Sequence, residues 1–296
     1  MASEALQELI AGMRAGGPDF SADPAEARAG FEALLATMPA DPAVTFTATD
    51  LAGVPTLEAN TGPVDAGALL YMHGGAYIAG SAAGYRGLAA EIGKVLGLPT
   101  YAIDYRLAPD APFPAAVEDA VMAYRELLAR GIPANRIVVA GDSAGGGLTL
   151  ALLVSLKNEG VELPAAAYVL SPWADLSCAH PLIAGKADAD PALDKPGLVA
   201  SAAHYLAGQD ADHPLASPVN ADLSGLPPLL VQVGSSEILL GDSIMVAERA
   251  GAAETHVQLE IFPEMLHVFQ SFHFMLPEAR AALDGAGAFL KARMGD

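Results

Sequence analysis

From about residue 43 onward the chain alternates short apolar runs with helical patterns, and no other sequence feature constrains its fold as strongly. Runs such as Ile137 to Ala140 and Leu229 to Val233 are almost wholly apolar, which is typical of strands buried on both faces of a parallel sheet. The pattern predicts an α/β fold, with an eight-stranded, mostly parallel sheet and helices on both faces. The predicted strands are 43–49, 53–59, 66–72, 99–105, 136–140, 166–170, 228–233 and 256–262. The predicted helices are 82–97, 114–130, 143–159, 242–252 and 276–294.

Two segments break this alternation. Residues 1–40 contain helical patches separated by Gly16, Gly17 and Pro18. Residues 177–220 are irregular, with a helix expected near 195–207. Each segment is too long for an ordinary connection in a compact domain, which indicates a functional lid. We therefore predict a core of residues 41–176 and 221–296, and a helical cap of residues 1–40 and 177–220.

Charge and cysteine content exclude several classes of partner. The chain has 15 Lys and Arg against 35 Asp and Glu, a formal net charge of -20, so nucleic acids and anionic membrane surfaces would be repelled. Cys178 is the single cysteine, which excludes an intrachain disulfide and fits a reducing compartment. Residues 1–14 lack the basic start of a signal peptide, and no apolar stretch is long enough to span a bilayer. We expect a cytoplasmic protein with no membrane or nucleic-acid partner.

The strongest motif for chemistry is Gly141-Asp142-Ser143-Ala144-Gly145. It follows a buried strand and opens a helix, the context of the G-x-S-x-G nucleophile elbow in the α/β-hydrolase fold. Glycines are needed there because the serine sits on a sharp, strained turn where neighbouring side chains would clash. A glycine-rich dinucleotide loop is an alternative, but the spacing G-x-G-x-x-G is absent. We predict that Ser143 is the nucleophile.

A second glycine motif, His73-Gly74-Gly75, comes directly after the predicted strand 66–72. In this fold the loop beside the elbow supplies backbone N–H donors to the oxyanion that forms during ester cleavage. We predict that the N–H groups of Gly74, Gly75 and Ala144 are these donors. His73 precedes the nucleophile, whereas the base comes last in the chain order of this fold, so we interpret His73 as a residue that stabilises the loop.

A serine nucleophile needs a base to take its proton, and the chain holds 7 histidines. The base belongs in the loop after the last strand, which we expect to end at Phe262. His267 lies a few residues past that point, whereas His273 lies in a run of Phe and Met that is typical of packing. We predict that His267 is the base.

The carboxylate that orients this base should follow the strand that ends at Val233. Glu237 and Asp242 are the two candidates in that loop. Asp242 immediately precedes an apolar-periodic helix, where an N-cap role explains an aspartate. We predict Glu237 as the acid because of its place in the loop, and Asp242 remains the alternative.

These motifs together resemble the bacterial hormone-sensitive-lipase-like esterases, over most of the chain after residue 40. The resemblance implies an esterase without metal or cofactor that acts on short or medium acyl chains under a helical cap. The family's acid motif usually reads Asp-Pro-Leu-x-x-Asp or similar, and this chain departs from it with Glu237 and no proline. The resemblance rests on His73-Gly74-Gly75, Tyr105 to Pro109, Phe113 to Ala116, the elbow around Ser143, and His267.

The sequence thus predicts a serine carboxylic ester hydrolase whose partner is a small-molecule ester. Ser143, His267 and Glu237 would form a triad that works through an acyl-enzyme. A lactonase or amidase with the same triad is one alternative. A ligand-binding homologue that has lost catalysis is another, because fold alone does not decide function.

Two further expectations concern metals and assembly. A metalloenzyme is disfavoured, because Asp188, Asp190, His204 and His213 are scattered along a loop and no metal-binding spacing occurs. The alternating last strand, 256–262, is expected at a sheet edge. Edges must be protected or paired, so we expect this one to pair in a homodimer.

Overall fold

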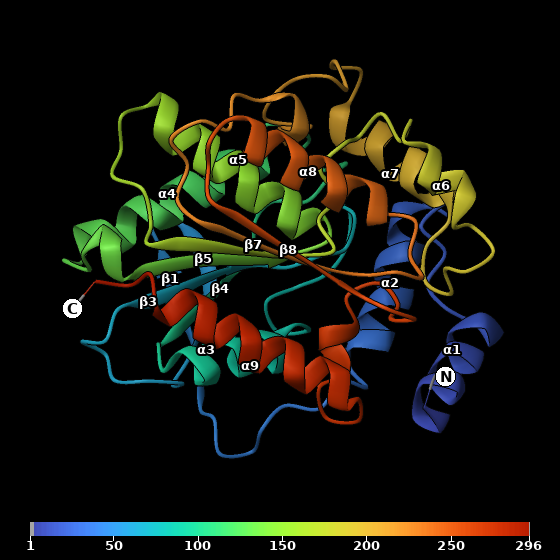
Figure 1. The fold of residues 1–296 in the computed structure, drawn as a ribbon, viewed down its shortest axis with the longest axis horizontal. Coiled ribbons are helices and arrows are strands. Elements are labelled where there is room, and N and C mark those ends of the chain that lie inside the picture. Colours follow the sequence, from blue (N-terminus) through green and yellow to red (C-terminus); the bar gives the residue numbers. More distant parts are fainter. Residues whose placement is uncertain (1–2, 296) are drawn as a thin grey trace.

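The structure, a computed structural model, describes residues 3–295 and contains the predicted sheet of eight strands. The strand order is β1-β2-β4-β3-β5-β6-β7-β8 (Figure 1). Every predicted strand is present, with boundaries that differ by a few residues. The strands are β1 (Phe46–Leu51), β2 (Val54–Ala59), β3 (Ala68–Met72), β4 (Thr100–Ile103), β5 (Ile137–Asp142), β6 (Ala166–Leu170), β7 (Leu229–Gly234) and β8 (Val257–Phe262).

Strand direction sets where functional loops meet. β1 and β2 form an antiparallel hairpin, and β2 is antiparallel to β4. All other neighbours, from β4 through β3, β5, β6 and β7 to β8, are parallel. The carboxyl ends of β3, β5, β6, β7 and β8 therefore lie along one edge of the sheet, where ligands bind in open α/β folds. The loops after these strands carry Gly75, Ser143, Ser171, Glu237 and His267.

Helices cover both faces of the sheet, as predicted (Figure 1). The side chains of β3 alternate between two apolar clusters, with Leu70 and Met72 in one and Leu69 and Tyr71 in the other, as the two-residue period of a strand requires. Within residues 3–295 no helix is both long enough and apolar enough to cross a bilayer. One face is covered by α3 (Arg86–Leu96) and α9 (Pro277–Lys291), and the other by α4 (Ala115–Ala129), α5 (Ala144–Asn158) and α8 (Leu240–Ala252). Short 3-10 turns are η1 (Ala134–Arg136), η2 (Pro218–Asn220) and η3 (Phe269–Phe272).

The segments that break the alternation lie together beyond one end of the sheet, where α1, α2, α6 and α7 gather in Figure 1. Arg14 of α1 donates a hydrogen bond of 2.7 Å to the carbonyl of Asp188, which joins the N-terminal segment to the later one. Ser3 and Asp23 cap α1 and α2 with their side chains, which satisfies N–H groups that a helix start leaves unpaired. The four helices are α1 (Glu4–Ala15), α2 (Pro24–Leu35), α6 (Pro181–Gly185) and α7 (Lys195–Leu206).

Candidate active site

Ser143 lies at the turn between β5 and α5, on a strained backbone with φ of 53° and ψ of -121°. The Ser143 N–H donates to the carbonyl of Leu170 at 2.9 Å, which holds the turn against β6. The flanking glycines are required by space. A Cβ on Gly141 would collide with the carbonyl oxygen of Gly145, and a Cβ on Gly145 would collide with that of Met72. Such strain is maintained only where surrounding structure over-determines it, and it is common at functional sites.

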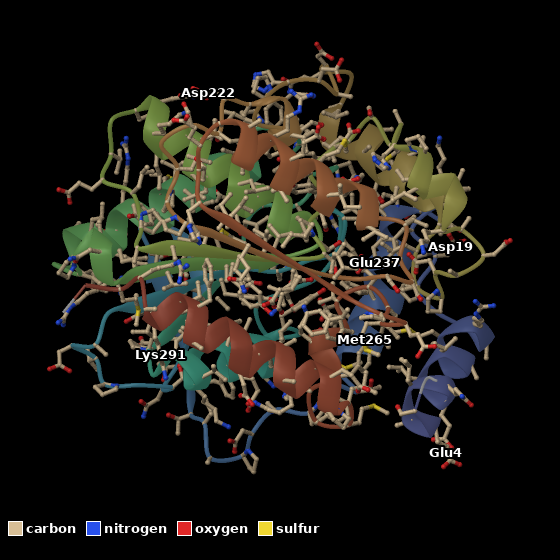
Figure 2. The ribbon with its side chains drawn as sticks, in the orientation of Figure 1. Glu4, Asp19, Asp222, Glu237, Met265 and Lys291 are labelled. Atoms are coloured by element: carbon tan, nitrogen blue, oxygen red, sulfur yellow. The ribbon has the colours of Figure 1, made fainter. Side chains whose placement is uncertain are left out.

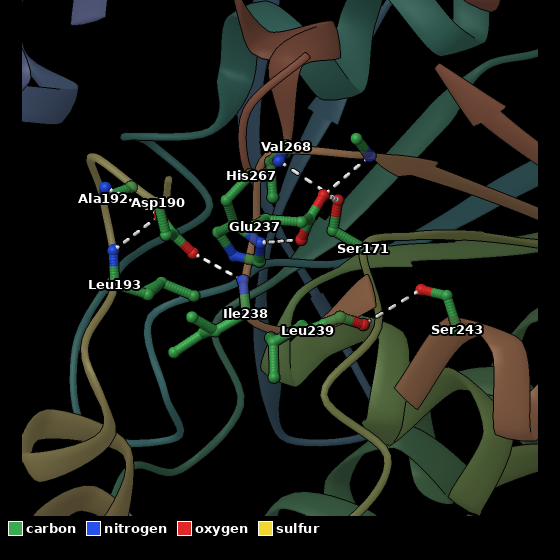
Figure 3. Close-up of polar contacts among 11 residues, drawn as sticks. Ser171, Asp190, Ala192, Leu193, Glu237, Ile238, Leu239, Ser243, His267 and Val268 are labelled. Carbon is green, nitrogen blue, oxygen red and sulfur yellow. Dashed lines mark hydrogen bonds and ion pairs between the residues drawn. The ribbon is translucent and has the colours of Figure 1, made fainter. Parts of the chain in front are cut away.

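His267 and Glu237 form a buried pair at the carboxyl edge of the sheet (Figure 3). Nδ1 of His267 lies 2.7 Å from Oε2 of Glu237. Glu237 is fully buried, and in Figure 2 it lies inside the fold, whereas Glu4 and Asp222 lie at its margin. With the proton on Nδ1 facing the carboxylate, Nε2 keeps the lone pair that a general base needs.

The other oxygen of Glu237 is held by two donors that fix the carboxylate. Oε1 accepts the hydroxyl of Ser171 at 2.7 Å and the N–H of Gly234 at 2.8 Å. Ser171 also accepts the N–H of Val268 at 3.2 Å, so one hydroxyl contacts both Glu237 and the residue after His267. Sequence reasoning missed Ser171. Its place directly after the buried strand 166–170, next to the strand that precedes Glu237, is the signal that points to it.

The His267 imidazole is buried among carboxylates. Burial disfavours the charged ring, but Glu237, Asp190 and Asp142 outweigh that effect, and the pKa of His267 is raised above its ordinary value. Glu237 comes from the loop after β7, Asp142 from the end of β5, and Asp190 from the loop between α6 and α7. Asp190 was read in the sequence as one of several scattered loop residues, and the structure instead buries it beside the Glu237 loop.

The predicted N-cap role of Asp242 is wrong. Helix α8 begins at Leu240, two residues earlier than predicted, and its N-cap is Leu239. Asp242 is fully buried, and its Oδ2 accepts the N–H groups of Ala174 and Asp175, each at 2.9 Å. Burial raises the pKa of Asp242 to about 8. The Asp242 side chain thus holds the loop after β6 through these two bonds, whereas the carboxylate that contacts His267 is that of Glu237.

The loop after β3 is held by hydrogen bonds to Asp142, and one of them occupies the N–H of Gly74, a predicted oxyanion donor. The N–H of Gly74 donates to Oδ1 of Asp142 at 2.9 Å, and the Tyr71 hydroxyl donates to the same oxygen at 2.6 Å. Gly74 is thereby removed from the predicted set of free donors. Burial raises the pKa of Asp142 to about 6. Gly75 and Ala76 lie next along the loop.

His73 stabilises this loop and does not line the cavity that opens beside Ser143. Its Nδ1 lies 2.7 Å from the carbonyl oxygen of Gly74. Its ring stacks with Tyr105 at 4.4 Å and with Tyr85 at 5.8 Å between ring centroids. Tyr105 also donates its hydroxyl to the carbonyl of His73 at 2.7 Å. Burial lowers the pKa of His73, which keeps its ring neutral.

A cavity of about 830 Å³ opens beside Ser143 and His267. Its lining includes Gly75 and Ala76 of the loop after β3. Its walls come from both segments that break the sheet alternation, residues 8–39 and 187–198, and from residues 267–275. His273, the other histidine near the end of the chain, is not among the lining residues and contacts the carbonyl of Gln270 instead. Apolar wall residues include Met13, Phe20, Phe31, Leu34, Met38, Leu88, Phe272 and Met275.

Across residues 3–295, no three His, Cys, Asp or Glu side chains gather closely enough to hold a metal ion. The four residues considered for a metal site in the sequence do not converge. What the site does offer is a strained serine, a buried imidazole with a fixed carboxylate, and a cavity that both the serine and the imidazole line. These are the parts of a nucleophile activated by a general base.

Comparisons with known proteins agree with this geometry. A family model described as the alpha/beta hydrolase fold matches residues 69–271. An acetyl-hydrolase of Streptomyces hygroscopicus is 48% identical over 232 residues, 78% of this chain and 78% of that protein. An esterase of Acinetobacter venetianus is 35% identical over 258 residues, 86% of this chain and 85% of that protein. The crystal structure of an esterase from the bacterial hormone-sensitive lipase family matches with a TM-score of 0.94 and 41% identity, covering 100% of both chains.

Fold and site together define a hydrolase of the α/β-hydrolase superfamily, with Ser143 on the strained turn between β5 and α5. Within that superfamily the chain belongs to the hormone-sensitive-lipase-like esterases, and it is a carboxylesterase.

Proposed function

We propose that this carboxylesterase hydrolyses short- to medium-chain acyl esters through an acyl-enzyme, with Ser143 as nucleophile, His267 as base and Glu237 as acid. The observation that carries the proposal is the 2.7 Å contact between His267 and Glu237 at a cavity that Ser143 also lines. Geometry and roles, rather than sequence position, identify such a triad.

The reaction runs in two acyl transfers. Ser143 attacks the ester carbonyl while Nε2 of His267 accepts the hydroxyl proton, and Glu237 stabilises the imidazolium that forms. The tetrahedral intermediate collapses, the bond to the alkoxy group breaks, and His267 gives its proton to the departing alcohol. Water then repeats the sequence on the acyl-enzyme, releasing the carboxylic acid and free Ser143.

The oxyanion is held by backbone N–H groups, and we assign Gly75, Ala76 and Ala144 to this role. Among the residues described, no bond from these N–H groups to a protein acceptor is found, whereas Gly74 donates to Asp142. Gly75 and Ala76 line the cavity with Ser143, and Ala144 begins α5, so its N–H is one that a helix start leaves free. The proposal thus retains Gly75 and Ala144 from the predicted set and replaces Gly74 with Ala76.

Substrate size follows from the walls of the cavity. Residues 1–40 and 177–220 act as a cap, because they supply most of the apolar surface over the nucleophile. A volume of about 830 Å³ lies within the range of small-molecule sites. The acetyl-hydrolase named among the relatives supports the short end of the acyl range.

The test is a panel of p-nitrophenyl esters from acetate to palmitate, together with lactones and amides, assayed on the wild type and on Ser143→Ala. We expect turnover to peak at short or medium esters and to vanish in the variant. Brief mixing with a slow ester should give an acyl adduct on Ser143 in mass spectrometry. Turnover by Ser143→Ala would overturn the mechanism, and preference for lactones or amides would replace the substrate class while keeping the triad.

A further inference from the structure

Asp190 joins the segment between α6 and α7 to the loop after β7 that carries Glu237. It lies between α6 and α7 and is only 8% exposed. Its Oδ1 accepts the N–H groups of Ala192 and Leu193 at 2.8 and 3.0 Å, which closes a local turn. Its Oδ2 accepts the N–H of Ile238 at 2.8 Å, across 48 positions of the chain (Figure 3). Both oxygens are therefore committed to backbone donors.

The bond to Ile238 restrains the backbone next to Glu237, because Ile238 follows Glu237 in the chain. The carboxylate of Glu237 is held by Ser171 and by the N–H of Gly234. The backbone on the far side of Glu237 is held by Asp190. Hydrogen bonds therefore hold both the side chain of Glu237 and the backbone that follows it. The bond to the backbone comes from the segment between α6 and α7, which also lines the cavity.

Within residues 3–295, the contacts of Asp190 include no charged group that would balance its ionised form. No cation bonds to it among the residues described, and backbone N–H groups are its only bonded partners. A buried charge without a counter-ion is costly unless donors and a nearby opposite charge offset it. Burial raises the pKa of Asp190 above its ordinary value, and the attraction of the nearby His267 offsets only part of that rise. The opposite charge arises at His267 during the reaction, when the imidazole takes the serine proton.

We propose that Asp190 is a positioning residue for the reaction. It holds the backbone of the Glu237 loop where Glu237 meets His267, and its ionised carboxylate acts as a second negative charge near the imidazolium. This inference rests on the proposed triad and adds to it. The segment between α6 and α7 then does more than enclose substrate, because its Asp190 also stabilises the positive charge that forms on His267.

The charges facing His267 come from three elements: Glu237 from the loop after β7, Asp190 from the segment between α6 and α7, and Asp142 from the end of β5. Removing one of them should favour the neutral imidazole. The acid limb of kcat/KM, which reports the base of the free enzyme, should then move to lower pH. A residue with a merely structural role would not move that limb.

The test uses two variants of Asp190 and one matched control. Asp190→Asn removes the charge, and Asp190→Ser keeps a local turn-forming oxygen while losing the charge and the reach to Ile238. The control is Asp188→Asn, an exposed carboxylate two positions away with no side-chain bond among the residues described. For both Asp190 variants we expect kcat to fall about 10- to 100-fold, the scale of a misplaced catalytic group, with KM nearly unchanged and the acid limb at lower pH. Asp188→Asn should match the wild type.

Each variant is then combined with Glu237→Gln. If Asp190 acts through the acid, most of its effect on kcat should be absent in that background, because coupled residues are not additive. Full activity and an unmoved acid limb in both Asp190 variants, with Glu237→Gln crippled, would overturn this inference and leave the triad standing. Full activity of Glu237→Gln alone would overturn the triad itself. If the losses of the Asp190 variants add to the loss of Glu237→Gln and the acid limb of kcat/KM does not move, Asp190 has a purely structural role, which would also overturn this inference. Thermal melts confirm folding, and Asp190→Ser carries the test should Asp190→Asn not fold.

Discussion

Nδ1 of His267 lies 2.7 Å from Oε2 of Glu237, although 30 positions separate the two residues. The contact is buried on both sides, with 9% of the His267 side chain and none of the Glu237 side chain exposed. Ser171 binds Oε1 of Glu237 and accepts the N–H of Val268, so the loops after β6, β7 and β8 are joined at this point. The contact favours one orientation of the imidazole before substrate arrives, which lowers the cost of organising the site during the reaction.

Ser143→Ala should remove about 10⁵- to 10⁶-fold of kcat, because the members of a triad act as a unit. Folding should be intact, since the Ser143 backbone N–H still reaches Leu170. A fluorophosphonate should label the wild type once per chain, at Ser143. Steady-state kinetics and peptide mapping by mass spectrometry measure both effects, and a label on any other residue would contradict the assignment.

The pH dependence of kcat/KM follows from the charges around His267. Only neutral imidazole accepts the serine proton, so activity should fall on acidification. Because the pKa of His267 is raised, this acid limb should lie above the pH of about 6.5 at which an unperturbed imidazole titrates. Glu237→Gln should move the limb to lower pH, since it removes the nearest negative charge. A rate that stays flat well below pH 6 would exclude histidine as the base.

Variants of the two carboxylates after β7 separate their roles. Glu237→Gln keeps shape but fails to fix the imidazole tautomer, and it should cost about 10³- to 10⁴-fold in kcat. Glu237→Asp keeps the charge with a shorter reach, and we expect intermediate activity. Asp242→Asn should cost little, because an amide oxygen can accept the N–H groups of Ala174 and Asp175 as Oδ2 does. Kinetics on all three, with melts as control, decide the matter: a crippled Asp242→Asn beside an active Glu237→Gln would reverse the assignment.

Deleting residues 1–40 should abolish or sharply reduce ester turnover. This segment lines the cavity, and its Leu6 is fully buried in an apolar cluster with Met265 and Phe269. The deletion should also raise binding of a hydrophobic dye, because it uncovers that cluster. Full activity of the truncated protein would refute the cap.

Arg28 of α2 offers a finer test of the same segment. Its guanidinium donates to the carbonyls of Ile78 and Ala108 at 2.7 and 2.8 Å, which ties α2 to the loop that carries Gly75. Arg28→Ala should lower kcat through this loop, whereas Arg125→Ala, which removes an exposed ion pair with Glu159, should be silent. Equal activity of the two variants would show that α2 does not position the loop.

Assembly through the β8 edge remains a prediction. β8 is the last strand of the sheet, and its Ile261 is 44% exposed. An unpaired edge with exposed apolar side chains favours pairing with a second copy. Analytical ultracentrifugation should show a dimer at micromolar concentration, and Ile261→Lys should shift it to monomer. Sedimentation of the wild type as monomer alone would contradict the prediction.

Much of this protein could be predicted from local patterns in its sequence. The five central strands, β3 to β7, follow from apolar runs whose burial on both faces demands such residues. The elbow follows from glycines that a strained turn needs, so Ser143 and its strand-turn-helix context were recognisable without coordinates. Chain order pointed to His267 and Glu237 in the loops after β8 and β7, and the structure brings their side chains into contact.

Other features depend on contacts that no local pattern encodes. The local sequence predicts a helix cap at Asp242. In the structure its buried side chain instead accepts the N–H groups of Ala174 and Asp175, on a loop 68 and 67 positions earlier in the chain. The N–H of Gly74 looked free, but Asp142, 68 positions away, accepts it. In the sequence Asp190 is one polar residue among several in an irregular loop. In the structure its carboxyl accepts the N–H of Ile238, 48 positions away. Periodicity and turn chemistry act over a few residues and determine which elements form. Which polar groups share a buried space depends on how distant elements pack, and a buried polar group must take whichever partner that packing brings within reach.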